Sequence, residues 1–396
     1  MYHAENFSCK DFFVVINKIY KILAWTLVFT RFTFMKIMIV LNRIARGGGE
    51  NVAVQLANQF SRMGHEIFFV SNKGRNDISD FYPIEENVQI LPCFRHYFPL
   101  KIFSLRRAIK RENPDIIIGI MPDSTFYTYL AALGLHKIII SSDHSSFEKN
   151  PYSQRHLFPY LLKFYFNAVY DCVTVLTKTD YDIVVKKFRR TEVMPNPLSM
   201  QPAESICVNR KKRILAAGRL NIWHCKGFDI LIKAWAKVQE KYPDWVVEIA
   251  GEGEIGRQYL EGLIAEKHLE NRVVLSGFHL NIKDFFNDSE IFVLSSRYEG
   301  FGMVLIEAMS QGAACIACDY KGRQREIIQD DSQGLCVECE NEEALASALS
   351  RMIEDEGYRR QVQENGWKRS YDFTPDKIGE NWMRLLGDLL ERQNRS

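Results

Sequence analysis

One segment of the chain decides the fold: Ser295-Ser296-Arg297-Tyr298-Glu299-Gly300-Phe301-Gly302-Met303-Val304-Leu305-Ile306-Glu307-Ala308-Met309. It follows the apolar run Ile291–Leu294 and precedes Gly312, so the pattern predicts a strand, a Gly-x-Gly turn and a short helix. Gly300 and Gly302 have no Cβ, so the backbone there can turn sharply and approach a ligand closely. The first amides of the helix lack partners within it, which favours a phosphate or a sugar hydroxyl nearby.

Two carboxylates bracket this turn, Glu299 before it and Glu307 inside the helix. A carboxylate accepts two hydrogen bonds and therefore suits a vicinal diol, as on a ribose or a hexose. An ordinary turn with two solvated glutamates is the alternative, and an isolated pair at this spacing would favour it. The whole stretch, however, resembles the retaining glycosyltransferases of family 4, whose E-x7-E signature lies in the setting E-G-F-G-x-x-x-x-E-A. Every element of that setting is present.

The composition predicts a globular cytoplasmic protein of two or three domains. The chain has 396 residues, of which 46% are hydrophobic and 25% charged. Nine cysteines, an odd number, and no cleavable signal predict a reducing compartment. Basic residues exceed acidic ones in residues 1–195, and the reverse holds in residues 196–396. The basic half predicts an anionic partner, such as the inner face of the cell membrane or a lipid diphosphate, and no pattern indicates a nucleic-acid partner.

Residues 1–34 form an apolar extension interrupted by Asn17, Lys18, Lys21 and Arg31. Its run Ile22–Thr30 is shorter than the ~20 residues that a membrane-spanning helix needs. Two interpretations stay open: an amphipathic anchor on the membrane surface, or a misassigned start with Met35 as the true first residue.

From Met35 onward, short apolar runs alternate with helical stretches, which predicts parallel sheets covered by helices. The strand Lys36–Leu41 leads to Gly47, Gly48 and Gly49, which precede a predicted helix over Val52–Met63. The resemblance implies that this glycine loop faces the donor diphosphate and the acceptor, and a simple tight turn is the alternative. Lys101–Arg111 predicts an amphipathic helix that, with Phe94, His96, Tyr97 and Phe98, either lies on a membrane or covers the sheet.

The predicted strand Lys137–Ser141 ends just before His144, and ligands in open α/β sheets bind at such strand ends. A histidine there can donate a hydrogen bond to a sugar hydroxyl, although single histidines are more often structural. Since family 4 has a functional histidine after this strand, the resemblance implies a catalytic role for His144.

Two motifs suggest metal sites. Asp180-Tyr181-Asp182 matches the D-x-D motif of metal-dependent glycosyltransferases, but Thr179 before a predicted helix Ile183–Phe188 favours an N-cap with acids in the first turn. Cys315, Cys318, Cys336 and Cys339 have the spacing of a zinc ribbon. Residues i and i+3 of a strand face opposite ways, so the predicted strands Ala313–Ala317 and Leu335–Val337 argue against a shared ion. We therefore expect no metal.

The second half carries further residues that match the family. Gly218-Arg219-Leu220 and Lys226-Gly227 resemble the pair of cations that binds the donor diphosphate, and Gly251 and Phe278 match positions near the nucleotide. Cations beside a departing diphosphate stabilise charge that grows in the transition state. At Gly322-Arg323-Gln324-Arg325-Glu326 the sequence departs from the family pattern, so Arg323 and Arg325 are expected to alter how donor or acceptor is held.

The resemblance covers about residues 35–390 and implies the GT-B fold, two Rossmann-like domains facing a central cleft. The expected units are the extension 1–34, an acceptor-side domain 35–198, a nucleotide-sugar domain 199–375 and a helix 376–396 that crosses back to the first domain. The implied catalytic residues are His144, Arg219, Lys226 and Glu299. The implied donor-binding residues are Gly47, Gly48, Gly49, Arg219, Lys226, Gly251, Phe278, Glu299, Gly300, Phe301, Gly302, Met303 and Glu307.

The implied activity is transfer of a hexose-type sugar from a nucleotide diphosphate sugar to a glycan acceptor, expected to be lipid-linked, in polysaccharide or glycan biosynthesis. No cofactor is implied, and the leaving phosphate would itself help to accept the acceptor's proton. A GT-B epimerase or phosphorylase is the alternative enzyme. A zinc-binding or membrane-docking protein without activity is the alternative outside catalysis.

Overall fold

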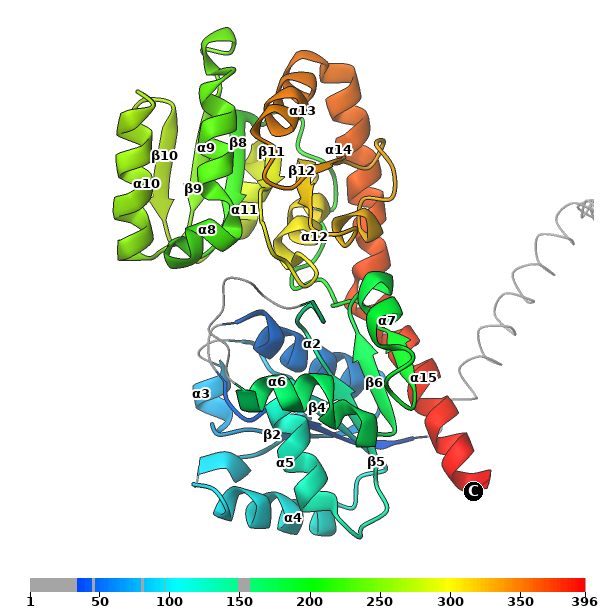
Figure 1. The fold of residues 1–396 in the computed structure, drawn as a ribbon. Helices are drawn as coiled ribbons and strands as arrows, with labels where there is room; N and C mark the ends of the chain where they lie inside the picture. The colour runs from blue at the N-terminus through cyan, green and yellow to red at the C-terminus, as the bar shows by residue number, and fades with distance from the viewer. Residues whose placement is uncertain (1–33, 45–46, 80–81, 96, 149–156, 396) are drawn as a thin grey trace, which may run out of the picture.

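The computed structural model describes residues 34–44, 47–79, 82–95, 97–148 and 157–395. The chain forms two parallel sheets, each covered by helices, and the two units are stacked one above the other (Figure 1). We call the unit built on the first sheet the first domain and the other unit the second domain. The predicted extension, apart from Phe34, and His96 lie outside the described residues.

Both sheets are wound in the same order. The first has the order β3-β2-β1-β4-β5-β6-β7 and the second β10-β9-β8-β11-β12-β13, and every pair is parallel. The first sheet contains β1 Lys36–Val40, β2 Glu66–Val70, β3 Gln89–Leu91, β4 Ile116–Ile120, β5 Ile138–Ser142, β6 Cys172–Val175 and β7 Thr191–Val193. The second contains β8 Lys211–Ala217, β9 Val246–Ala250, β10 Val273–Gly277, β11 Ser289–Leu294, β12 Ala314–Asp319 and β13 Leu335–Glu338. This doubly wound order is that of the Rossmann fold, so the predicted architecture is confirmed.

The helices connect the strands and cover the sheets. The first domain contains α2 Gly48–Arg62, α3 Arg75–Ser79, α4 Leu100–Glu112, α5 Pro122–Ala132, α6 Leu157–Phe164 and α7 Lys178–Val184. The second contains α8 Trp223–Lys226, α9 Phe228–Ala236, α10 Glu254–Glu266, α11 Ile282–Asp288, α12 Met303–Ser310, α13 Glu342–Glu354 and α14 Glu356–Ser370. α2 begins at Gly48 rather than Val52 as predicted, so two of the three loop glycines belong to its first turn.

Successive residues of the central strands enter different cores, as expected of sheets buried on both faces. In β1, Ile37 and Ile39 pack into one apolar cluster, whereas Met38 and Val40 pack into another. In β8, Ile214 and Leu215 are likewise divided between two clusters. Both sheets are therefore rigid supports for the loops at their carboxyl ends.

The last helix, α15 Pro375–Arg395, extends from the second domain onto the first (Figure 1). Its Trp382 packs edge-on against Phe60 of α2, with ring centroids 6.1 Å apart, and Gln59 donates a hydrogen bond to Asp376. Six of its apolar residues belong to the core of the first domain: Ile378, Trp382, Met383, Leu385, Leu386 and Leu389. Within the described ranges no helix is both long and apolar enough to cross a membrane.

Candidate active site

The loops at the carboxyl ends of strands from both sheets meet between the two domains. Gly300, which follows β11, lies against the segment after β5: a Cβ built on it would be 3.2 Å from the Ser145 Cα and the Ser146 nitrogen. Tyr298 places its hydroxyl 3.5 Å from the Ser146 oxygen and 3.4 Å from the Glu148 oxygen. We call residues 295–309 the signature segment and residues 143–148 the His144 segment. The structure thus brings the signature segment of the second domain onto the His144 segment of the first.

The signature segment folds as predicted into a strand, a turn and a helix. Gly302 is the N-cap of α12 and has a φ of +97°, a conformation that favours glycine. Met303 is the first residue of α12, so its amide and that of Val304 lack partners in the helix, whereas the Leu305 amide donates to the Gly302 oxygen. The Ser295 hydroxyl donates a hydrogen bond of 3.0 Å to the Lys226 oxygen, which fixes the turn against α8.

Glu299 and Lys226, predicted to hold the sugar and the diphosphate, are in direct contact. The Lys226 Nζ lies 2.5 Å from the Glu299 Oε1, and the Ser296 hydroxyl donates a hydrogen bond of 2.9 Å to the same oxygen. The two side chains are 21% and 13% exposed. Each therefore neutralises the other in the free protein, and an arriving diphosphate would compete for the ammonium.

Glu307 lies eight residues further along, in a different environment. Its carboxylate accepts a hydrogen bond from Ser199, in the segment that links the two domains. Burial raises the pKa of the Glu307 carboxyl above its ordinary value, and the hydrogen bond from Ser199 opposes this rise. The two glutamates thus differ in partner and in charge environment, as two distinct binding roles would require.

Two strand ends beside the signature segment come together at glycines. A Cβ on Gly251, after β9, would be 1.8 Å from the Gly218 oxygen, after β8, so only glycine fits there. Arg219 follows directly and is exposed, and none of the described acidic residues forms an ion pair with it. Phe278, just after β10, is half exposed. The structure leaves Arg219 and Phe278 accessible and explains Gly251 by packing.

His144 has partners on both ring nitrogens. Its Nδ1 is 2.7 Å from the Asn196 Oδ1, and its Nε2 is 3.1 Å from the Ser142 hydroxyl, which itself accepts from Thr174. Burial lowers the pKa of the imidazole, so His144 is neutral at pH 7. These contacts fit a ring that donates to Asn196 and accepts from Ser142. To form a hydrogen bond with a sugar hydroxyl, the His144 ring would have to release Asn196 or Ser142.

The glycine loop lies beside His144. A Cβ on Gly49 would be 3.9 Å from the Cβ of His144, and Gly47 exchanges two hydrogen bonds with the Tyr82 hydroxyl at 2.9 and 3.0 Å. The first turn of α2 and the His144 segment therefore form one continuous surface opposite Gly300.

The D-x-D interpretation needs a correction. The N-cap of α7 is Thr177, not Thr179, and its hydroxyl accepts from the Asp180 amide. Asp180 is buried and binds Arg323, whereas Asp182 is exposed and pairs with Lys178. The two extra arginines bind protein carboxylates: Arg323 contacts Asp180, and Arg325 contacts Asp319.

The four cysteines of the zinc-like spacing lie on or after two strands, as predicted. Cys315 and Cys318 are buried in β12, while Cys336 and Cys339 are half-buried. Burial raises the pKa of Cys339 to about 11 and that of Cys318 to about 12, so both are thiols at pH 7. Among the described residues no cluster of three metal-binding side chains occurs.

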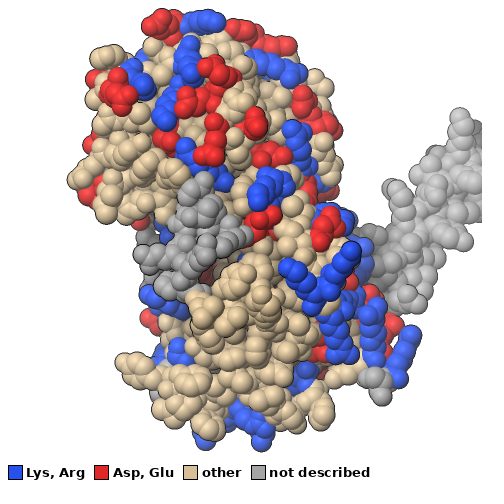
Figure 2. Space-filling model, viewed as in Figure 1, with Lys and Arg blue, Asp and Glu red and all other residues tan. Residues whose placement is uncertain are grey.

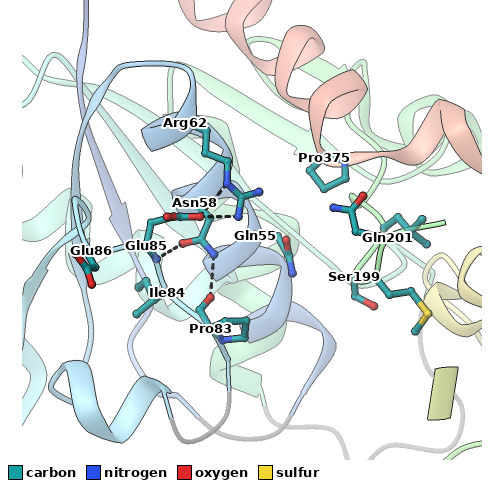
Figure 3. A pocket seen from close by; sticks show the side chains of 12 residues that line it. Gln55, Asn58, Arg62, Pro83, Ile84, Glu85, Glu86, Ser199, Gln201 and Pro375 are labelled. Carbon is teal, nitrogen blue, oxygen red and sulfur yellow. Dashed lines mark hydrogen bonds and ion pairs between the residues drawn. The ribbon is translucent and has the colours of Figure 1, made fainter. Parts of the chain in front are cut away.

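A cavity of about 380 Å³ lies behind the site, where α2 faces the segment that links the domains (Figure 3). Ser199, the partner of Glu307, lines this cavity. Two residues of α2 in the cavity wall have protein partners: Arg62 binds Glu85, and Asn58 bonds to Pro83 and Glu85. This cavity therefore offers polar walls and one half-exposed cation, Arg62, which is paired with Glu85.

Sequence reasoning did not assign Asn196, Ser199, Asp180 and Arg323 their observed roles. Asn196 lies between Pro195 and Pro197, and Ser199 follows two residues later, a double-proline pattern that indicates a break between domains but no binding partner. Asp180 and Arg323 are far apart in the sequence, so no local pattern could have paired them.

Two family models match the chain. "Glycosyl transferases group 1" matches residues 201–369, and "Glycosyltransferase Family 4" matches residues 46–201. A GalNAc-α-(1→4)-GalNAc-α-(1→3)-diNAcBac-PP-undecaprenol α-1,4-N-acetyl-D-galactosaminyltransferase of Campylobacter jejuni is 27% identical over 90% of this chain and 99% of that protein. The amylovoran biosynthesis glycosyltransferase AmsD of Erwinia amylovora is 28% identical over 89% and 99%.

Solved structures share the fold. Sucrose-phosphate synthase of Thermosynechococcus elongatus has a TM-score of 0.75 at 19% identity, over 91% of this chain and all of the other. HepE of Anabaena in complex with UDP-glucose has a TM-score of 0.72 at 19% identity, over 89% and 100%. The fold is GT-B, and because the two family models together match residues 46–369, the chain belongs to the glycosyltransferases of family 4.

Proposed function

We propose that this protein transfers a hexose-type sugar, with retention of anomeric configuration, from a UDP-sugar to a lipid-linked glycan. The observation that carries this proposal is the placement of Glu299 and Glu307 in two different environments of one segment, with Lys226 bound to the first. UDP is proposed because HepE and TarM were crystallised with it. The lipid-linked acceptor is proposed because the Campylobacter relative is named for an undecaprenol diphosphate substrate.

Each residue of the site has a proposed task. Glu307 accepts hydrogen bonds from the ribose hydroxyls, and Glu299 holds the transferred sugar. Arg219 and Lys226 bind the diphosphate, and the amides of Gly300–Met303 support the sugar and the phosphate. Gly47, Gly48 and Gly49 let the backbone approach from the first domain, while Gly251 and Phe278 lie near the nucleotide.

The proposed reaction is attack of an acceptor hydroxyl on the face from which the diphosphate leaves. The glycosidic bond to the diphosphate breaks, the new bond forms on the same face, and the leaving phosphate accepts the proton. Arg219, Lys226 and the amide end of α12 stabilise the growing negative charge, so the proposed reaction is independent of a metal. His144, neutral and fixed by Asn196, shapes the acceptor side.

A thermal unfolding screen with UDP-, GDP- and ADP-sugars tests the donor. A UDP-sugar should raise the melting temperature of the wild type, and at the same concentration it should raise that of Glu307→Ala less. Stabilisation by a GDP- or ADP-sugar alone would contradict the choice of UDP. The anomeric configuration of the transferred sugar, read by NMR, tests retention, and an inverted product would refute it.

We further propose that the first domain docks on an anionic membrane through α6. Of the predicted docking surface, Phe94 is buried, whereas Tyr97, Phe98 and Phe103 are exposed. α6 and the residue after it add the exposed apolar side chains of Leu157, Phe158, Tyr160, Leu161 and Tyr165. In Figure 2 the front of the first domain, where Figure 1 places α6, is a surface without charged side chains, and basic side chains border it. An apolar surface beside basic residues suits an anionic leaflet, at ~1 kcal/mol per basic residue.

Sedimentation with liposomes tests this docking. Phe158→Ser and Leu161→Ser together should abolish binding to vesicles that contain anionic lipid, whereas Leu280→Ser, an exposed leucine of the second domain, should not. Equal sedimentation with and without anionic lipid would refute the proposal. Loss of a dimer in the double variant would instead identify a second copy as the partner.

A further inference from the structure

A buried ion pair connects the two domains away from the signature segment. Asp180 of α7 is 1% exposed and Arg323, after β12, is fully buried. The Arg323 Nη2 lies 2.6 Å from the Asp180 Oδ1 and its Nε lies 3.2 Å from Oδ2, a bidentate contact. Such a geometry fixes orientation as well as distance.

Asp180 also holds the segment that carries His144. Its Oδ1 accepts a hydrogen bond of 2.7 Å from the Phe147 amide, three residues after His144, and its Oδ2 accepts one of 2.7 Å from the Thr177 hydroxyl. Both oxygens are therefore saturated by protein groups, and one carboxylate joins the second domain to the His144 segment.

A second carboxylate reinforces this contact from the other domain. Glu326 of the second domain accepts hydrogen bonds from the Lys178 amide at 2.6 Å and the Thr179 amide at 2.8 Å, the first amides of α7. Arg369 donates to the Ile327 and Glu326 oxygens and thereby holds this segment on α14. A carboxylate at a helix N-terminus is favoured by the unpaired amides and the helix dipole.

The His144 segment is therefore held on two sides. Asp180 binds it at Phe147, while Tyr298 and Gly300, the neighbours of Glu299, contact it at Ser145, Ser146 and Glu148. Any change in the angle between the domains would move His144 relative to Glu299.

We propose that Asp180, Arg323 and Glu326 are positioning residues that hold the two domains in the closed arrangement in which glycosyl transfer occurs. The proposal deepens the function proposed above and rests on it. A buried ion pair contributes little net stability, since desolvation offsets the attraction, but it defines one geometry. A displacement of about 1 Å at a reacting centre can lower a rate about a hundredfold.

Matched pairs of variants test this proposal. Asp180→Asn and Arg323→Gln remove the buried charges, while Asp182→Asn and Arg325→Gln remove exposed charges two residues away. Small-angle X-ray scattering measures the radius of gyration without any ligand. Turnover of the UDP-sugar that stabilises the wild type and calorimetric titration with UDP complete the set.

We expect Asp180→Asn and Arg323→Gln to increase the radius of gyration and to lower kcat about a hundredfold, with UDP affinity unchanged. The two surface variants should match the wild type. Unchanged scattering and turnover in the buried variants would overturn the proposal, and so would a loss of UDP affinity equal to the loss of turnover, which would place the pair in the donor site.

Glu326→Gln covers the case in which Asp180→Asn does not fold. It keeps the shape of the side chain, and we expect a severalfold loss of kcat together with the larger radius of gyration. If Glu326→Gln behaves as the wild type, the proposal is wrong. If no UDP-sugar binds, the proposed function fails, but the scattering comparison still decides whether these residues hold the domains closed.

Discussion

The two sides of the candidate site differ in how much of their polar chemistry is already used. On the second domain, Arg219 is exposed, and Lys226 and Glu299 bind each other within reach of solvent. On the first domain, both ring nitrogens of His144 are bound, by Asn196 and Ser142. Under the proposed function, the second domain would recognise the donor and stabilise charge, whereas the first domain would supply a fixed shape.

The largest expected effect is that of Glu299→Ala. If Glu299 supports the transferred sugar mainly in the transition state, its loss should lower kcat by roughly 10²–10³-fold. UDP lacks the sugar, so its affinity should remain nearly intact in calorimetric titration. Glu299→Gln separates charge from shape, since it keeps the side-chain length. A parallel loss of UDP affinity would show that Glu299 acts on the nucleotide instead.

Glu307→Ala should show the opposite pattern. Its carboxylate is proposed to accept hydrogen bonds from the ribose, and losing about 1.5–3 kcal/mol of this interaction should lower the affinity for UDP about ten- to hundredfold. Titration with UDP of both glutamate variants decides the assignment. No loss in Glu307→Ala, or equal losses in the two variants, would contradict it.

The raised pKa of Glu307 adds a dependence on pH. Because burial favours the protonated carboxyl, the affinity for UDP should begin to fall on acidification at a higher pH than the 4.5 of an ordinary glutamate. UDP itself titrates in this range, so Glu307→Gln is the control, and the difference between the two curves isolates the carboxylate. Identical curves would mean that Glu307 does not contact the nucleotide.

His144 should have a smaller effect, because its nitrogens are already bound. His144→Asn removes hydrogen bonds of about 1 kcal/mol each and should lower kcat roughly tenfold. Since its pKa lies below 6.5, the imidazole stays neutral above that pH, and the kcat profile should show no step near 6.5 that the variant abolishes. Such a step would make His144 a titrating catalytic group.

The lowered pKa of His144 also predicts how the stability of the protein depends on pH. The unfolded chain binds a proton at His144 more readily than the native one, so the free energy of unfolding should fall as pH drops below about 6.5. Thermal unfolding between pH 5 and 8 should show a weaker dependence in His144→Asn. His65, whose pKa burial also lowers, is present in both proteins and cancels in the comparison.

The two sides also differ in how far the sequence could predict them. The turn from Glu299 to Glu307 is one contiguous segment, and glycines and carboxylates at fixed spacing have direct local consequences for the backbone. The parallel sheets likewise follow from apolar runs that alternate with helical stretches, since parallel strands need crossover helices. Those parts were predictable because their causes are local.

The remaining features depend on contacts between distant residues. The sequence predicted Asp180 only as an acid in the first turn of a helix, and its role as the partner of Arg323 follows from the approach of the other domain. The apolar exposure of α6 was not predicted either. Nearly every residue of Leu157–Phe164 is apolar, so no periodicity shows which side faces solvent.

The smallest expected effect is that of removing divalent metal ions, which should leave the activity unchanged. Asp180 cannot ligate an ion without releasing its three protein partners, which are Arg323, Thr177 and the Phe147 amide. Asp182 lies on the same helix, but it is exposed and pairs with Lys178. In the proposed function, Arg219 and Lys226 instead supply the positive charge at the diphosphate. Activity should therefore persist in excess EDTA, with the wild type and Asp182→Asn equally active. Complete loss with EDTA, restored by Mg²⁺ or Mn²⁺, would show that the two cations do not suffice and would return the acidic pair to the site.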